Sequence, residues 1–193
     1  MRRVVHHTGL IDDAVEARAY QLEAVDEALT GSMLLVLPTA AGKTAVAWMT
    51  IAEILKKDRG WILFLAPTNG LVDQHVKDLR RIIKNIKKYN VISMTGSISP
   101  EKRKDLWNSA RIIVATPHVV RNDVLTGNLS LQGCSHLVID EAHHSTGKHP
   151  MAITAELYNS EARKPLILAM TASPGSKTEI VAEICERLKI ERI

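Results

Sequence analysis

The stretch LLVLPTAAGKT, residues 34–44, decides how the rest of this chain is interpreted. Its apolar residues run into Pro38, a loop of small residues follows, and the sequence GKT opens a helical pattern. This order of strand, loop and helix is typical of a phosphate-binding loop, in which backbone N–H groups and a lysine face the phosphates. The general pattern is G-x-x-x-x-G-K-[ST], and Leu37 stands at its first position. The stretch therefore indicates a nucleotide site without deciding the class of enzyme.

The composition is that of an ordinary globular domain. The chain has 193 residues, 46% of them hydrophobic and 24% charged, which is enough for one domain with a substantial core. The formal net charge of +4 permits a polyanionic partner without requiring one. Cys134 and Cys185 are too few for a disulfide framework and lack the spacing of a metal site. No run reaches the length of a membrane span and no signal peptide is recognisable, so we expect a cytoplasmic protein without a membrane partner.

Short apolar runs alternate with helical patterns along the chain. The candidates for strands are residues 33–37, 61–65, 91–94, 112–115, 137–139 and 166–170. Helical spacing of apolar residues predicts helices at 19–29, 44–55 and 71–88, between the later strands, and after the last one. Five or six strands that alternate with helices predict an α/β fold, a parallel sheet with helices on both faces. We expect residues 1–17 to form an N-terminal arm and residues 18–193 to form one domain.

The sequence HLVIDEAHH, residues 136–144, ends a predicted strand with Asp140 and Glu141. Ligands of parallel sheets bind beyond the carboxyl ends of the strands, so this pair and the phosphate-binding loop are expected at one edge. A nucleotide hydrolase needs two carboxylates there, one to hold Mg²⁺ and one to polarise the attacking water. Acids also begin many helices for structural reasons, and the presence of the phosphate-binding loop is what favours the catalytic interpretation.

A third motif, Thr171-Ala172-Ser173, follows another predicted strand. By itself this sequence is typical of a polar turn that caps the next helix. Its position after the strand that follows Asp140 and Glu141 makes it a further candidate for the same edge of the sheet.

The motifs PTAAGKT (38–44), DEAH (140–143) and TAS (171–173), in this order, resemble those of the first RecA-like domain of superfamily-two helicases of the DEAD/DEAH-box type. Within that superfamily the chain looks most similar to the archaeal Hef and FANCM branch, which remodels branched DNA. The RIG-I-like and Dicer-type proteins, which engage double-stranded RNA, are close behind. Ala40 departs from the family, which usually has glycine at a position where the backbone must turn tightly.

The resemblance implies ATP and Mg²⁺ as cofactors and assigns residues to them. Residues that would shape the base pocket are Arg18, Tyr20 and Gln21, with Gln21 bonded to adenine. Residues of the phosphate loop are Pro38, Thr39, Ala40, Ala41, Gly42, Lys43 and Thr44. Lys43, Asp140 and Glu141 would be catalytic, with Glu141 as general base. Thr44 and Asp140 would hold the metal.

The resemblance also implies a nucleic-acid site and residues that couple it to the nucleotide. The coupling residues would be His143, Thr171, Ala172 and Ser173. The residues along the sugar–phosphate backbone would be Pro67, Thr68, Gln74, Gly96, Thr116 and Pro117. Such contacts would be largely independent of base sequence. Basic side chains on the predicted helix at 71–88 form either a solvated surface or a track for phosphates.

These features favour an ATP-dependent nucleic-acid motor domain that acts on DNA rather than RNA. The family's second RecA-like domain, which would supply an arginine finger, is not within these 193 residues. We therefore expect the chain to bind ATP but to hydrolyse it poorly. The alternatives are a non-catalytic nucleic-acid-binding or docking module, an ATPase directed to double-stranded RNA, and a small-molecule phosphotransferase.

Overall fold

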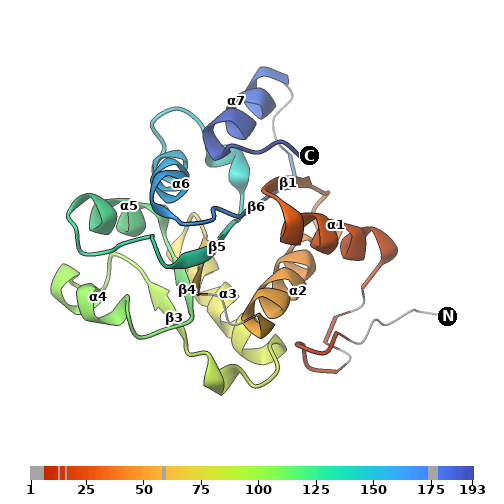
Figure 1. The fold of residues 1–193 in the computed structure, drawn as a ribbon, viewed down its shortest axis with the longest axis horizontal. Coiled ribbons are helices and arrows are strands. Elements are labelled where there is room, and N and C mark those ends of the chain that lie inside the picture. The colour runs from red at the N-terminus through yellow and green to blue at the C-terminus, as the bar shows by residue number, and fades with distance from the viewer. Residues whose placement is uncertain (1–6, 13, 16, 58–59, 174–177) are drawn as a thin grey trace.

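A six-stranded sheet forms the centre of the molecule (Figure 1). The structure is a computed structural model that describes residues 7–12, 14–15, 17–57, 60–173 and 178–193. The strands are β1 (Met33–Val36), β2 (Trp61–Leu65), β3 (Val91–Met94), β4 (Ile112–Ala115), β5 (Cys134–Ile139) and β6 (Ile167–Thr171). Their order across the sheet is β1-β6-β5-β2-β4-β3, and all five pairings are parallel. The predicted α/β fold with a parallel sheet is confirmed.

Helices cover both faces of this sheet. They are α1 (Ala19–Thr30), α2 (Lys43–Lys56), α3 (Asn69–Ile82), α4 (Pro100–Leu106), α5 (Pro117–Leu125), α6 (Pro150–Glu161) and α7 (Thr178–Leu188), with short 3₁₀ helices at Ile86–Lys88 and Ala142–His144. Within the described ranges, no helix combines the length and the apolar character that crossing a membrane requires.

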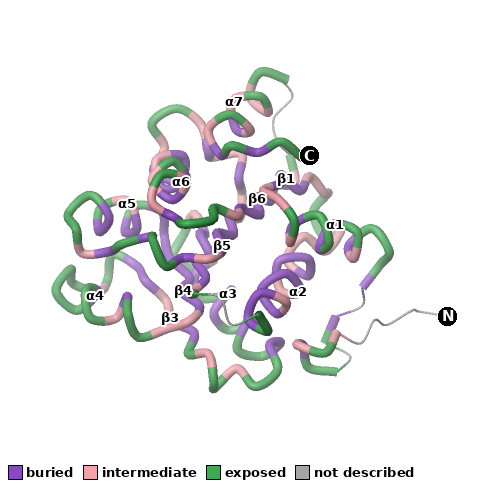
Figure 2. Tube along the Cα trace, in the orientation of Figure 1, coloured by how far each residue is buried: buried purple, intermediate pink, exposed green. Residues whose placement is uncertain are grey.

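The strands alternate their side chains between two hydrophobic cores. In β2, Ile62 and Phe64 join the core that contains α1, α2 and α3, whereas Leu63 and Leu65 join the core that contains α5, α6 and α7. All four side chains are fully buried. Figure 2 shows the buried residues of the chain in purple. Because each strand is apolar on both faces, the sheet can only be stable between two layers of helices.

The prediction of a helix at 71–88 is wrong at the C-terminal end of that range. Helix α3 stops at Ile82, and Ile83 is extended, buried, and paired with Leu10 in an antiparallel bridge. The N–H of Ile11 donates to the Ile82 carbonyl oxygen at 2.8 Å, and the N–H of Lys84 donates to the Gly9 carbonyl oxygen at 2.9 Å. These bonds to residues 9–11 replace the bonds that a longer helix would make. The predicted arm at 1–17 lies partly outside the described residues, but its Leu10 belongs to the core.

Two basic side chains on α3 have partners within the chain. The Arg80 guanidinium donates to the Val91 carbonyl oxygen at 2.6 Å, and Arg81 pairs with Asp78 at 3.4 Å. Arg80 therefore links α3 to β3 by a hydrogen bond.

A buried ion pair joins α4 to α5. Arg103 and Asp123 are 7% and 1% exposed, and two bonds of 2.7 Å link the guanidinium to both carboxylate oxygens. The indole N–H of Trp107 also donates to Asp123, at 2.8 Å. Three charge-assisted bonds on one buried carboxylate make this aspartate the anchor of the α4–α5 corner.

Replacing Asp123 with alanine should lower the free energy of unfolding by about 3–5 kcal/mol, because the Arg103 charge would stay buried without its partner. Urea unfolding followed by circular dichroism measures this change. The matched control is Asp78→Ala, which removes the pair with the exposed Arg81 and the bond from the exposed Gln74 and should cost less than about 1 kcal/mol. Equal losses in the two variants would contradict the role of Asp123.

Candidate nucleotide-binding site

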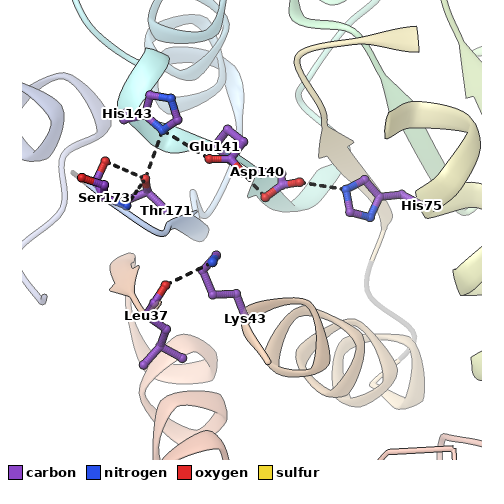
Figure 3. Close-up of polar contacts among 8 residues, drawn as sticks. All are labelled: Leu37, Lys43, His75, Asp140, Glu141, His143, Thr171 and Ser173. Carbon is purple, nitrogen blue, oxygen red and sulfur yellow. Dashed lines mark hydrogen bonds and ion pairs between the residues drawn. The ribbon is translucent and has the colours of Figure 1, made fainter. Parts of the chain in front are cut away.

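The predicted nucleotide motifs lie at the carboxyl ends of three adjacent strands. The phosphate-binding loop follows β1, Thr171 ends β6, and Asp140 follows β5. These strands are neighbours in the order β1-β6-β5. The sheet therefore brings together motifs that lie far apart in the sequence, as the close-up in Figure 3 shows.

Two residues of the phosphate-binding loop, between β1 and α2, have left-handed backbone conformations. Ala40 has φ of +64° and Gly42 has φ of +87°. Gly42 is the N-cap of α2, so the free N–H groups of this helix begin at the loop. The left-handed conformation costs an L-residue about 1–2 kcal/mol, and Ala40 carries that cost where glycine would not. The departure from the family pattern, alanine in place of glycine, therefore adds backbone strain to the loop.

The segment that contains Arg18, Tyr20 and Gln21 is bonded to this loop. The Gln21 amide is buried; it accepts from the Arg18 backbone N–H at 2.8 Å and donates to the Ala41 carbonyl oxygen at 3.2 Å. The Tyr20 hydroxyl donates to the same Ala41 oxygen at 2.7 Å. Arg18 in turn donates to the Tyr20 hydroxyl at 3.3 Å. Two of the predicted base-pocket residues, Tyr20 and Gln21, thus bind the backbone of the loop at Ala41, and Arg18 supports both of them.

A small cavity of about 210 Å³ lies between this segment and the loop. The described residues that line it are Ala14, Val15, Arg18, Gln21, Ala40, Ala41, Gly42, Ala45 and Trp48. Tyr20 is not among these residues, although it contacts the loop. The cavity brings two of the predicted base-pocket residues together with the phosphate-binding loop.

Lys43 and the two acids face the same space (Figure 3). The Lys43 ammonium donates to the Leu37 carbonyl oxygen at 3.1 Å. One oxygen of Asp140 accepts from the Glu141 backbone N–H at 3.0 Å. Glu141 has φ of +53°, a left-handed conformation that is sterically costly for glutamate. Backbone strain of this kind is often found at functional sites.

His143 connects Glu141 to the motif that ends β6. Its Nδ1 atom lies 3.3 Å from Glu141 Oε2 and 3.1 Å from the Thr171 hydroxyl. The Thr171 hydroxyl donates to the Ser173 carbonyl oxygen at 3.2 Å and accepts from the Ser173 N–H at 3.3 Å. Three of the four predicted coupling residues therefore form one hydrogen-bonded chain, and Ala172 lies within its turn.

The ring of His144 packs against His143, with ring centroids 4.2 Å apart. Burial lowers the pKa of His144, and the neighbouring His143 lowers it further, while Glu141 acts in the opposite direction. His144 therefore favours the neutral ring beside the acidic motif.

The predicted metal residues, Thr44 and Asp140, offer a hydroxyl and a carboxylate. These are hard oxygen donors of the kind that Mg²⁺ prefers. The donor set therefore fits magnesium.

The predicted nucleic-acid residues follow the other three strands, β2, β4 and β3. Thr68 is the N-cap of α3, and its hydroxyl accepts from the Leu71 N–H at 3.3 Å. Gly96, after β3, is exposed, and no heavy atom lies within 4 Å of where its side chain would begin. The exposed Gln74 donates to Asp78 at 3.0 Å. Pro67 is half-buried, and Thr116 and Pro117 at the start of α5 are buried.

The sequence reasoning missed His75. This side chain lies on α3 with its Nε2 atom 2.9 Å from Asp140 Oδ2. The available signal was its spacing, because position 75 falls between Val72 and Leu79 on the apolar face of α3. A polar residue on such a face needs a partner.

Replacing Gly42 with alanine should lower the free energy of unfolding by about 1–3 kcal/mol, because the left-handed backbone would be strained. The new methyl would also lie 2.1 Å from Gln21 Nε2 and displace that amide. The matched control is Gly70→Ala in α3, where nothing lies within 4 Å, and alanine should stabilise the helix by about 0.5–1 kcal/mol. Thermal unfolding of both variants tests the contrast, and two changes of the same sign would contradict it.

Comparisons with known proteins agree with this geometry. A family model described as DEAD/DEAH box helicase matches residues 18–181. The chain is 41% identical, over 189 residues, to a Methanocaldococcus jannaschii protein that is named as a candidate ATP-dependent RNA helicase. This match covers 98% of the present chain and 24% of the Methanocaldococcus protein. It is 31% identical, over 192 residues, to the DEAD-box ATP-dependent DNA helicase Fancm of Drosophila melanogaster, covering 97% of this chain and 13% of that protein.

Among solved structures, the helicase domain of Pyrococcus furiosus Hef matches with a TM-score of 0.89 and 39% identity, over 95% of this chain and 39% of that chain. The chain thus spans 24% or less of the length of these two curated relatives. The resemblance to the Hef and FANCM branch is confirmed, and so is the RecA-like fold. The chain belongs to the DEAD/DEAH box helicase family.

Proposed function

We propose that this chain is the ATP-binding motor domain of a superfamily-two helicase or translocase that resembles Hef and FANCM and acts on branched DNA. The observation that carries the proposal is the division of one sheet edge. The nucleotide motifs follow β1, β6 and β5, and the candidate nucleic-acid loops follow β2, β4 and β3. ATP and nucleic acid would therefore bind side by side on one rigid element.

ATP fits the chemistry of the first half of this edge. The loop at residues 38–42 and the N-terminus of α2 would receive the phosphates, and Lys43 would exchange its bond with the Leu37 carbonyl for a phosphate oxygen. Gly42 adopts the left-handed conformation at the start of α2 without the strain that a side chain would add. Arg18 and Gln21 would border the base from the adjoining cavity.

The acids would support hydrolysis. Thr44 and Asp140 would hold Mg²⁺, which when bound neutralises charge on the phosphates. Glu141 would accept a proton from the attacking water, as a general base does. Its contact with His143, and that of His143 with Thr171, would report the state of the nucleotide to the rest of the domain.

The other half of the edge would bind nucleic acid. Thr68, Gln74 and Gly96 are exposed there, and small residues allow backbone N–H groups to approach phosphates. The buried Thr116 and Pro117 would act through the backbone at the start of α5. The choice of DNA rests on the Fancm relative, which is named a DNA helicase. An RNA substrate is the alternative, because the Methanocaldococcus relative is named for RNA.

We further propose that residues 18–193 form the first RecA-like domain and that residues 1–17 form an arm before it. Efficient turnover would need a second RecA-like domain, because the arginine finger that such a domain supplies accelerates hydrolysis by about 10³–10⁵. This chain by itself should therefore bind ATP and hydrolyse it slowly.

Titration with the fluorescent analogue mant-ATP tests the nucleotide site. Lys43→Ala should abolish most of the affinity, whereas Glu141→Gln should retain it because that change spares the phosphate contacts. Single-turnover assays with ATP should show hydrolysis slowed by about 10²–10⁴ in Glu141→Gln, the usual worth of a general base. A docking module would show no Lys43-dependent affinity, and normal hydrolysis in Glu141→Gln would remove Glu141 from its role.

Nucleic-acid affinity should be largely electrostatic. For a forked DNA duplex we expect a loss of at least about tenfold between 50 and 200 mM salt, which corresponds to roughly two neutralised phosphates. Fluorescence anisotropy with two forks of unrelated sequence and one double-stranded RNA measures this. The two forks should bind equally. Affinity that ignores salt, or stronger binding of the RNA, would contradict the proposed DNA contacts.

A further inference from the structure

One long-range hydrogen bond connects the two halves of the sheet edge. His75 lies on α3, which follows β2, whereas Asp140 follows β5. The Nε2 atom of His75 lies 2.9 Å from Asp140 Oδ2 (Figure 3). The side chains are 6% and 13% exposed, so bulk water screens the bond weakly.

The ring of His75 is held in place by packing. It lies against the ring of Phe64 in β2, with centroids 4.4 Å apart and planes tilted by 37°. Phe64 is fully buried and pairs in register with Val138 of β5, the strand that ends at Asp140. The histidine and the aspartate are therefore anchored to two hydrogen-bonded neighbours in the sheet.

The direction of the bond follows from the chemistry of the two groups. A carboxylate only accepts, so Nε2 must carry the proton and donate it to Asp140. The Nδ1 atom of His75 is buried and has no hydrogen-bond partner among the described residues. In the part of the chain that the structure describes, the contact with Asp140 is the only hydrogen bond or ion pair that this buried ring makes.

The bond determines how Asp140 is presented. The other oxygen, Oδ1, accepts from the backbone N–H of the next residue, Glu141, which restrains the carboxylate only locally. His75 restrains it from a different element, 65 residues away in the sequence. With both oxygens held, the carboxylate keeps one orientation, and its remaining lone pairs stay available.

We propose that His75 is a positioning residue that orients Asp140 for the binding of Mg²⁺ with the nucleotide. This inference rests on the proposed function, in which Asp140 holds the metal. Partners that orient metal-binding carboxylates usually contribute about 10–100-fold to metal affinity. His75 would act through Asp140 without touching the nucleotide.

The test measures how much Mg²⁺ is needed for half-maximal binding of mant-ATP to the 193-residue chain. His75→Leu keeps the packing on Phe64 but cannot donate, so it should raise this concentration by about 10–100-fold. His75→Gln places an amide N–H near the position of Nε2 and should restore most of the wild-type value. In EDTA, all three chains should bind mant-ATP equally weakly.

The matched control is His136→Gln. His136 is also buried in the sheet, where its Nδ1 atom lies 3.0 Å from the Leu166 carbonyl oxygen, and burial lowers its pKa to about 4. This change should lower the melting temperature without altering the Mg²⁺ requirement. If His75→Leu behaves in the same way, His75 is only structural and the proposal is overturned.

Two further outcomes separate this proposal from the proposed function. Binding of mant-ATP that depends on Lys43 but not on Mg²⁺ would overturn the role of His75 and leave the nucleotide site standing. Failure of His75→Gln to restore the Mg²⁺ requirement would also overturn the hydrogen bond as the cause. Absence of any Lys43-dependent binding would overturn both proposals.

Discussion

The parallel pairing of the six strands, most of them buried on both faces, is the constraint on which the rest of the structure depends. Each strand places alternate residues in two cores, so a shift of register by one residue would exchange the side chains of the two faces. Fixed register in turn fixes where each strand ends. The motifs of the candidate site lie at or directly after those ends. The packing of the sheet therefore determines the positions of these motifs relative to one another.

Much of this arrangement could be predicted from local sequence. The strand at 61–65 is observed as Trp61–Leu65, and that at 112–115 as Ile112–Ala115, because uninterrupted apolar runs of this length suit a strand covered on both faces. The motifs that follow the strands also indicated the nucleotide-binding edge, because ligands of parallel sheets bind beyond the carboxyl ends of the strands. Their chemical roles stay predictions, since proximity alone does not show which group moves a proton or holds a metal.

The features that sequence reasoning missed or placed wrongly depend on distant partners. The end of α3 was misplaced because residues 82–84 pair with residues 9–11, and helical periodicity contains no information about that strand-like contact. His75 was missed because its partner lies in another element. The ion pair of Arg103 and Asp123 was equally hidden, because charged residues on short helices usually face water. In each case a nonlocal bond overrides a local pattern.

The division of the sheet edge also sets a length scale. Neighbouring strands are about 4.8 Å apart, so an edge of six strands is roughly 24 Å long. A nucleotide on one half and a phosphodiester backbone on the other would be only a few strand spacings apart. The strands between them are joined by hydrogen bonds, so this distance would change little. The sheet would then keep the distance between the two ligands constant, and large movements of one ligand relative to the other would not arise within this sheet.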